Sequence, residues 1–411
     1  MLLQLYKRTK NKLRRQRQDT LVLRGILHGS RAWIGPQIVQ FDVTNRCNNN
    51  CLCCWNNSPL LGEPSEARRE EKEYELPFDL IKRTIAELRE MGTKILFFAG
   101  GGEPFMHPQI MEILKYAKES NMRIIMNTNF TLIDKKRAEE IVDLKVDFIH
   151  VSLLAGTAET YALIHPNKTT ETFYQIKEIL QYIAYLKQER NQNSPVPLPH
   201  IDLYYVIFNT NYRDIDSMVN LGIEVKANSL EFTPIDIIPG KTDILLLNDM
   251  QKKEVIRDIK IQNRKLEKLN RQQGVMIIFI EQYSSFINRL SAEGAVKGEY
   301  EVNTLVNWPC YVGWAFLRIL ANGNVIPCLK AHRISVGNIY EQSIKDIWNS
   351  PEQQLFRKES FKLDRNSLYF RMIGNNPDAQ FGCLNSCDNI QINIDMHKKY
   401  GGILSKYGKV E

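Results

Sequence analysis

Short apolar runs alternate with longer amphipathic stretches between Gln37 and about Pro239. The short runs predict strands at Ile38–Val43, Ile95–Ala99, Arg123–Asn127, Phe148–Leu153, Ile201–Ile207 and Leu230–Ile235. The longer stretches repeat apolar residues on one helical face and predict helices at Leu80–Met91, Pro108–Ser120, Lys135–Asp143, Glu171–Gln188 and Arg213–Leu221. Such regular alternation is typical of a parallel sheet, and six units of this kind predict an α/β fold built as a partial (β/α)6 barrel.

The alternation of apolar runs and amphipathic stretches ends after residue 240. On this basis we divide the chain into four parts. We expect a basic leader at 1–36, the partial barrel at 37–240, a helical linker at 241–306 and a smaller C-terminal domain at 307–411. The linker contains a charged stretch that predicts a helix at Gln251–Gln273, followed by an apolar strand at Val275–Ile280. With 411 residues, the chain is long enough for one large domain and a smaller second one.

The formal net charge of +7 is concentrated in the leader. Its cations are Lys7, Arg8, Lys10, Lys12, Arg14, Arg15 and Arg17, and Asp19 is the only acid among the first twenty residues. The rest of the chain is close to neutral, which argues against a nucleic-acid-binding body. The leader could form a basic amphipathic helix on an anionic membrane or a partner. Because its apolar face is short, we favour a solvated helix that packs loosely on the barrel.

The sequence contains no apolar run of about eighteen residues, the length that a membrane-spanning helix needs. The leader has its charges after a short apolar piece, which is the wrong layout for a secretory signal. We therefore expect a cytoplasmic protein. In such a reducing compartment, the eight cysteines are better read as metal ligands than as disulfides.

Three cysteines follow the first predicted strand with the spacing Cys-x3-Cys-x2-Cys, at Cys47, Cys51 and Cys54. A loop of that length can hold three irons of a 4Fe-4S cluster and leave the fourth iron open to a small molecule. A zinc knuckle would require a second pair of ligands nearby, and the next cysteine after this loop is the distant Cys310. We interpret Cys53 as a thiol that binds no iron.

This loop resembles the cluster loop of the radical S-adenosylmethionine (radical SAM) superfamily. The second predicted strand ends in Phe98-Ala-Gly-Gly-Gly-Glu-Pro104, which matches the position of the Gly-Gly-Glu-Pro motif in these enzymes. The resemblance implies that S-adenosylmethionine chelates the open iron, and that an electron from a flavodoxin- or ferredoxin-type donor cleaves it to a 5′-deoxyadenosyl radical.

The same resemblance assigns roles to residues at the carboxyl ends of the predicted strands. It implies that Gly101, Gly102 and Glu103 line the methionine amino group, and that Asn129 and Ser152 hold the ribose or carboxylate of the cofactor. Family members commonly have an aromatic residue where this chain has Cys53. We expect Trp55 to replace its contact with the adenine.

The remaining cysteines, Cys310, Cys328, Cys383 and Cys387, lie in the C-terminal part. The pattern Cys310-x12-Gly323-x4-Cys328, followed by Gly337-Asn-Ile339 and an Ile-Trp pair, resembles the SPASM/Twitch extension of radical SAM enzymes. The resemblance implies an auxiliary 4Fe-4S cluster with four thiolate ligands, and such a cluster has no open iron and conducts electrons. A structural zinc would also use four cysteines, but the seventeen-residue gap inside the first pair is long for zinc.

Three functions are compatible with these motifs. We favour a radical SAM oxidoreductase that takes hydrogen from a small molecule such as a sugar, aminosugar or cyclitol, with the auxiliary cluster as electron acceptor. The alternative is a maturase that makes thioether links, carbon–carbon links or epimers in a ribosomal peptide, although about 36 residues before the barrel are too few for a separate peptide-binding domain. The third function is a non-enzymatic iron-sulfur electron carrier, which would not need the glycine-rich strand end.

Two polar residues of the later strands are further candidates for substrate contact. Asn209 follows the fifth predicted strand and Glu231 lies on the sixth, and on a barrel both are expected to face the cavity. Glu231 has apolar neighbours and could equally be ion-paired within the core. The sequence does not identify a catalytic base.

Overall fold

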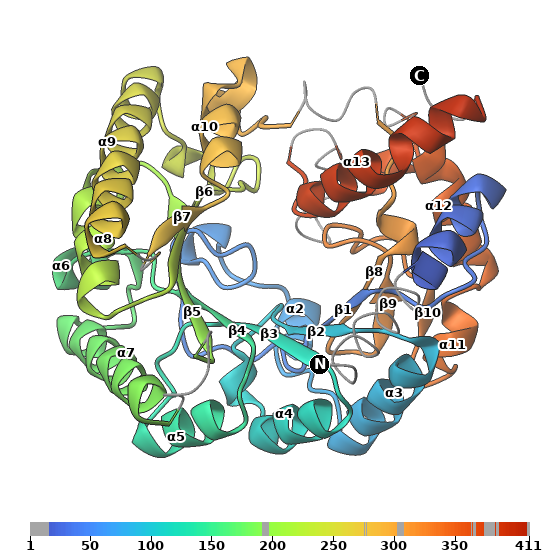
Figure 1. The fold of residues 1–411 in the computed structure, drawn as a ribbon, viewed down its shortest axis with the longest axis horizontal. Coiled ribbons are helices and arrows are strands. Elements are labelled where there is room, and N and C mark those ends of the chain that lie inside the picture. The colour runs from blue at the N-terminus through green and yellow to red at the C-terminus, as the bar shows by residue number, and fades with distance from the viewer. Residues whose placement is uncertain are drawn as a thin grey trace.

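A curved sheet of ten strands runs through the molecule, and helices cover its outer face (Figure 1). The computed structural model describes residues 16–190, 197–274, 276, 278–301, 308–362, 364, 367–373, 383 and 386–408. The strands lie in the order β10-β9-β8-β1-β2-β3-β4-β5-β6-β7. Their bounds are β1 Ile38–Phe41, β2 Ile95–Phe98, β3 Arg123–Thr128, β4 Phe148–Ser152, β5 His200–Ile207, β6 Ser229–Pro234, β7 Phe279–Glu281, β8 Phe316–Ile319, β9 Asn324–Ile326 and β10 Gly337–Asn338.

All six strands that the alternation predicts are present, and β1 to β7 pair in parallel. The predicted helices are also present, together with shorter ones that the pattern did not reveal, such as α6 and α10. The helices are α2 Glu66–Glu71, α3 Phe78–Met91, α4 Ile110–Glu119, α5 Lys135–Asp143, α6 Ala158–Ile164, α7 Thr170–Arg190, α8 Ile215–Glu224, α9 Asp249–Gln273, α10 Tyr283–Ser291, α11 Ile344–Ile347, α12 Pro351–Phe361 and α13 Ile390–Lys406. The α/β fold with a partial barrel is thus confirmed.

The two faces of the barrel strands differ in burial. On β4, Ile149 and Val151 are fully buried beneath the helices, whereas Phe148, His150 and Ser152 on the opposite face are only half-buried. Side chains at alternate strand positions point to opposite faces, so the second set lines the concave interior of the sheet. The polar side chains of that set make up the candidate site.

The C-terminal part continues the barrel sheet instead of forming a detached domain. Its strand β8 pairs in parallel with β1, with Phe316 opposite Ile38 and Ile319 opposite Phe41. Strand β9 then pairs antiparallel with β8. The pattern of the sequence did not predict this pairing, because it joins segments that are far apart along the chain.

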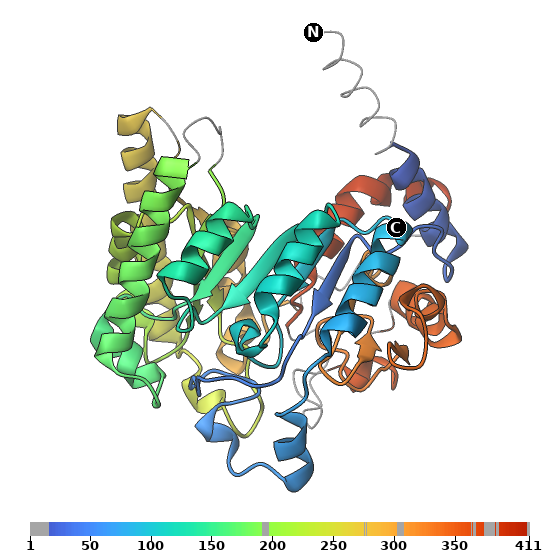
Figure 2. The ribbon, with the colours of Figure 1, turned by 90° about the horizontal axis from the view of Figure 1, so that it is seen from below.

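The N-terminal segment packs on the C-terminal part. Residues 16–28 are helical, and in Figure 2 this helix lies beside α13. Val22 and Ile26 are buried, and a β carbon placed on Gly25 would lie 2.9 Å from the ring of Trp314. The leader also reaches the barrel, where the N–H of Gly35 donates to the Met91 carbonyl at the end of α3 at 3.1 Å. Residues 1–15, which carry most of its cations, lie outside the described residues.

Candidate cluster and cofactor site

The loop after β1 is held against the glycine-rich end of β2 by very close backbone approach. A β carbon on Gly102 would lie 2.2 Å from the carbonyl oxygen of Arg46, and one on Gly101 would lie 2.3 Å from the Asn45 side-chain oxygen. The N–H of Glu103 donates to the same Arg46 carbonyl at 2.8 Å. Glycine is therefore required here because the cluster loop itself occupies the space of a side chain.

The structure brings Cys47, Cys51 and Cys54 together in this loop. Burial, followed by the neighbouring thiols Cys53, Cys54 and Cys47, raises the pKa of Cys51 well above its usual value. Burial likewise raises the pKa of Cys47 to about 12, with smaller contributions from Glu103 and Cys54. Buried thiols of this kind ionise when a metal binds, because the metal takes the thiolate form.

Hydrogen-bond donors already point at two of these sulfur atoms. The backbone N–H groups of Asn56 and Asn57 donate to the Cys54 sulfur at 3.4 and 3.2 Å, and that of Asn49 donates to the Cys47 sulfur at 3.4 Å. Donors of this kind stabilise the negative charge of a thiolate. The donor set thus fits a cluster held by three cysteines.

The carboxylate of Glu103 connects the ends of β2 and β3. It accepts from the Thr128 hydroxyl at 2.7 Å, from the backbone N–H of Asn129 at 2.7 Å and from that of Phe105 at 3.2 Å. Burial raises its pKa to about 7, although these hydrogen bonds lower it. The Glu103 carboxylate therefore links the two strand ends. A contact with a cofactor would use the lone pairs of its oxygens that these three donors leave free.

Asn129 fastens β3 to the cluster loop. Its amide nitrogen donates to the side-chain oxygen of Asn48 at 2.9 Å and lies 4.0 Å from the sulfur of Cys47. Ser152 ends the next strand, β4, and is half-buried on the concave face. The structure thus places Asn129 at the cluster loop and Ser152 at the mouth of the barrel.

The four C-terminal cysteines line one cavity. The cavity is bounded by Cys310, Cys328, Cys383 and Cys387 together with apolar residues such as Phe356 and Phe370. Burial raises the pKa of Cys387 well above its usual value, and Cys383, Cys310 and Cys328 raise it further. Four thiols that interact around one enclosed space fit a metal centre with four cysteine ligands.

Glu231 was named in the sequence analysis, but two polar side chains beside it on the concave face, His150 and Asp202, were missed. The His150 Nδ1 lies 2.9 Å from Asp202 on β5 and 3.9 Å from Glu231 on β6. Asp202 is fully buried and also accepts from the Ser229 hydroxyl at 2.6 Å. His150 could have been identified because it lies two residues before Ser152 on the same predicted strand, and alternate residues of a strand point to the same face.

Two sequence profiles match the chain at these two cysteine groups. The radical SAM superfamily profile matches residues 41–222, and that of an iron-sulfur cluster-binding domain, SPASM, matches residues 310–368. The chain belongs to the radical SAM superfamily. Both the family and the C-terminal extension that the motifs implied are therefore confirmed.

Similar proteins cover most of the radical SAM chain at low identity. A tungsten-containing aldehyde ferredoxin oxidoreductase cofactor-modifying protein of Pyrococcus furiosus is 22% identical over 342 residues, which are 80% of this chain and 84% of the relative. A PqqA peptide cyclase of Gluconobacter oxydans is 22% identical over 331 residues, covering 78% and 79% of the two chains. The solved structure of native anSMEcpe with bound AdoMet and Cp18Cys peptide has a TM-score of 0.56 and 16% identity, and covers 90% and 98%. At that identity, the likeness shows the fold.

As a radical SAM enzyme with a SPASM domain, the protein uses S-adenosylmethionine and two 4Fe-4S clusters. The three thiols of the β1 loop and the four thiols of the C-terminal cavity fit the two clusters. Among the described residues, no helix has the length and apolar character needed to cross a membrane. Nothing in the described part supports the membrane contact that the leader suggested.

Two side chains named in the sequence analysis make contacts that it did not predict. The ring of Trp55 packs on His332 at 5.1 Å between centroids, and the guanidinium of Arg318 lies 5.6 Å from its ring centroid, so Trp55 faces the C-terminal part. Its expected contact with adenine stays a prediction. Asn209 donates to the Ile244 carbonyl at 2.6 Å and fastens a loop. Its contact with a substrate stays a prediction.

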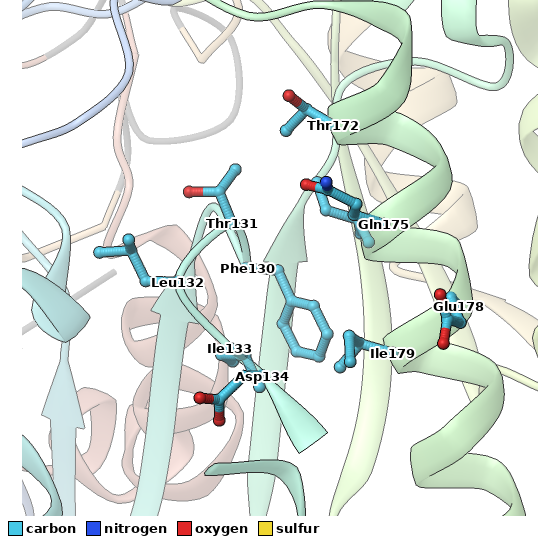
Figure 3. Close-up of a pocket in the computed structure, with 10 residues that line it drawn as sticks. Phe130, Thr131, Leu132, Ile133, Asp134, Thr172, Gln175, Glu178 and Ile179 are labelled. Carbon is cyan, nitrogen blue, oxygen red and sulfur yellow. The ribbon is translucent and has the colours of Figure 1, made fainter. Parts of the chain in front are cut away.

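A separate cavity of about 300 Å³ lies between the loop after β3 and helix α7 (Figure 3). Its two acidic residues are already engaged, since Asp134 accepts from the Arg137 N–H at 2.8 Å and Glu178 pairs with Lys135 at 2.9 Å. No cysteine lines this cavity. It is not the site of either cluster.

Proposed function

We propose that this radical SAM enzyme modifies a peptide. The observation that carries the proposal is the likeness, over most of the chain, to a peptide cyclase and to a structure that contains a bound peptide. These comparisons favour the alternative over the oxidation of a sugar, aminosugar or cyclitol that the motifs first suggested.

The short segment before the barrel is compatible with a peptide substrate. We expected peptide maturases to need a binding domain before the barrel. However, 98% of the peptide-bound chain is covered by the match to this protein. A chain of this architecture can therefore receive a peptide without such an added domain, and the concave face of the barrel is the surface that we assign to it.

Each part of the site has a defined task in this proposal. Cys47, Cys51 and Cys54 hold the first cluster, and Glu103 and Asn129 fix its loop to the strand ends. When bound, the cluster and S-adenosylmethionine supply the 5′-deoxyadenosyl radical that takes a hydrogen atom from the substrate. The four C-terminal cysteines hold the auxiliary cluster, which we propose as the electron acceptor of an oxidative reaction.

The test is to reconstitute the protein without oxygen and to supply S-adenosylmethionine, dithionite and synthetic peptides encoded by short reading frames beside its gene. A parallel set receives sugars, aminosugars and cyclitols. We expect a peptide to change mass and to increase the release of 5′-deoxyadenosine. If only a member of the small-molecule set is changed, the peptide proposal is wrong and small-molecule oxidation replaces it.

The Cys383→Ala variant tests the role of the auxiliary cluster. We expect it to cleave S-adenosylmethionine but to lose oxidation of the substrate, since the substrate radical would have no electron acceptor. Turnover at the parental rate by a folded Cys383→Ala protein would indicate a redox-neutral outcome such as epimerisation.

A further inference from the structure

Glu231 lies at the level of the barrel where the cofactor is expected. The strand register pairs Ser152 on β4 with Tyr204 on β5, and Tyr204 with Glu231 on β6. Adjacent strands are about 4.8 Å apart, so Glu231 lies about 10 Å across the sheet from Ser152. Its side chain is 15% exposed and faces the concave interior.

The same strand leads from Glu231 toward the auxiliary cysteines. Thr233 points to the same face as Glu231 and accepts from the Arg289 guanidinium at 2.8 Å. A second nitrogen of Arg289 donates to the Ser386 hydroxyl at 3.3 Å, and Ser386 is next to Cys387. Glu231 therefore lies between the cofactor end of the barrel and the auxiliary cluster, where a substrate in the concave interior can reach it.

Among the described residues, the contacts of Glu231 leave one of its carboxylate oxygens available. Gln282 donates to Oε1 at 2.9 Å, whereas Oε2 lies 3.9 Å from the Nδ1 of His150, beyond hydrogen-bond distance. His150 is held in place by Asp202 at 2.9 Å. Asp202 in turn accepts from Ser229, whose hydroxyl lies 2.8 Å from His200.

We propose that Oε2 of Glu231, which lies beside His150 on the concave face, accepts a proton from the substrate. The inference rests on the proposed peptide-modifying function. In this step an N–H, O–H or S–H bond of the peptide breaks, an O–H bond forms at Oε2 of Glu231, and the electron pair of the broken bond stays on the peptide atom. Glu231 is partly exposed, and loss of this proton to water after the modified peptide leaves restores the carboxylate.

The charges around Glu231 suit this role. Burial raises its pKa to about 7, His150 and Arg289 lower it, and Asp202 and Glu281 raise it. Burial lowers the pKa of His200 to about 4, so His200 adds no charge at neutral pH. A carboxyl that changes its protonation near neutral pH can both accept and release a proton under physiological conditions.

Infrared titration of the anaerobic holoenzyme tests the carboxyl without any substrate. Protonated carboxyl groups absorb apart from carboxylates, and we expect a band that disappears as the pH rises through about 7. Glu103, whose pKa is also about 7, should contribute a part of this band that remains in Glu231→Gln. The Glu231 part should be missing in that variant. It should titrate at lower pH in Glu281→Gln, which loses a like charge, and at higher pH in His150→Gln, which loses an opposing one.

Two results would overturn the proposal. One is a band that keeps its full parental amplitude in folded Glu231→Gln, or of which no part responds to either neighbouring substitution. The other is that Mn²⁺ binds one to one, removes the band, and fails to bind to His150→Gln and Asp202→Asn. His150, Asp202 and Glu231 would then form a metal site, since their ligand atoms all lie within 4.8 Å of one another.

A second measurement tests the catalytic role with a peptide that the parent enzyme modifies. The ratio of modified peptide to released 5′-deoxyadenosine should fall about 100-fold in Glu231→Gln, the usual contribution of a general base. An unchanged ratio would overturn the proposal. If the parent enzyme modifies no peptide, the peptide function fails, while the infrared titration still decides whether Glu231 is the titrating carboxyl.

Discussion

At the scale of single residues, Glu103 gives the protein a pH-dependent stability. Burial raises its pKa from 4.5 to about 7, so the folded state holds its proton more tightly than the unfolded state does. This contribution of about 3 kcal/mol is complete below pH 4.5 and is lost as the pH rises through about 7. Urea unfolding at several pH values should therefore show a smaller loss of stability over this window in Glu103→Gln than in the parent.

The exposed Glu90 at the end of α3 supplies a matched control. Glu90→Gln should keep the parental dependence of the unfolding free energy on pH. If both variants keep it, the Glu103 carboxyl is ionised throughout this range in the folded protein. The hydrogen bonds from Thr128 and Asn129 would then outweigh the effect of burial.

The sequence identified several site residues but not the contacts that they make. The spacing of Cys47, Cys51 and Cys54 predicts a group of thiols because a short loop leaves little freedom in their positions. The role of Trp55 could not be predicted, since its partners His332 and Arg318 come from a distant part of the chain. The strand pattern could place His150 on the inward face, but not its pairing with Asp202, because that contact depends on the neighbouring strand.

At the scale of elements, the close packing of the cluster loop on the end of β2 makes Gly102 indispensable. A β carbon there would lie 2.2 Å from the Arg46 carbonyl, so Gly102→Ala should displace the loop. We expect reconstituted Gly102→Ala to hold about four irons instead of about eight, because the auxiliary cluster remains. Replacing Cys47, Cys51 and Cys54 together with alanine should give the same iron content.

Gly402→Ala is the control for this substitution. Gly402 lies in α13, where an added β carbon meets nothing within 4 Å, and alanine is the better helix former. The control should keep about eight irons. If Gly102→Ala also keeps them, the loop can move away from β2 without losing its cluster.

The barrel elements could be predicted because each carries its own periodic pattern. The strand and helix positions from β1 to β6 follow from local alternation, and the parallel order follows from the βα connections. The contacts of Arg357 could not be predicted in this way. This buried side chain on α12 donates to the carbonyl oxygens of Gly313, Trp348 and Ser30, and thereby joins the N-terminal segment to the C-terminal part.

At the scale of the whole molecule, one sheet couples the two cluster sites. The pairing of β8 with β1 places the C-terminal part directly beside the strand that leads into the first cluster loop. Strand pairing between segments so far apart has no signature in local periodicity, which is why the sequence suggested two separate domains. The shared sheet indicates that the two parts unfold together.

A buried ion pair between Asp42 and Arg318 crosses this junction, and it leads to a test of joint unfolding. Arg318 donates to both carboxylate oxygens of Asp42, at 2.7 to 3.1 Å, and both side chains are almost fully buried. Arg318→Met leaves a buried carboxylate without its cation and should lower the unfolding free energy by about 3–5 kcal/mol. Asp42→Asn should lower the unfolding free energy by a similar amount, whereas the double variant should recover part of the loss.

Urea unfolding followed by tryptophan fluorescence and by cluster absorbance should give coincident transitions in the parent. The losses of unfolding free energy could instead simply add in the double variant, or the parent could show separate transitions. Either result would show that the two parts are stabilised independently.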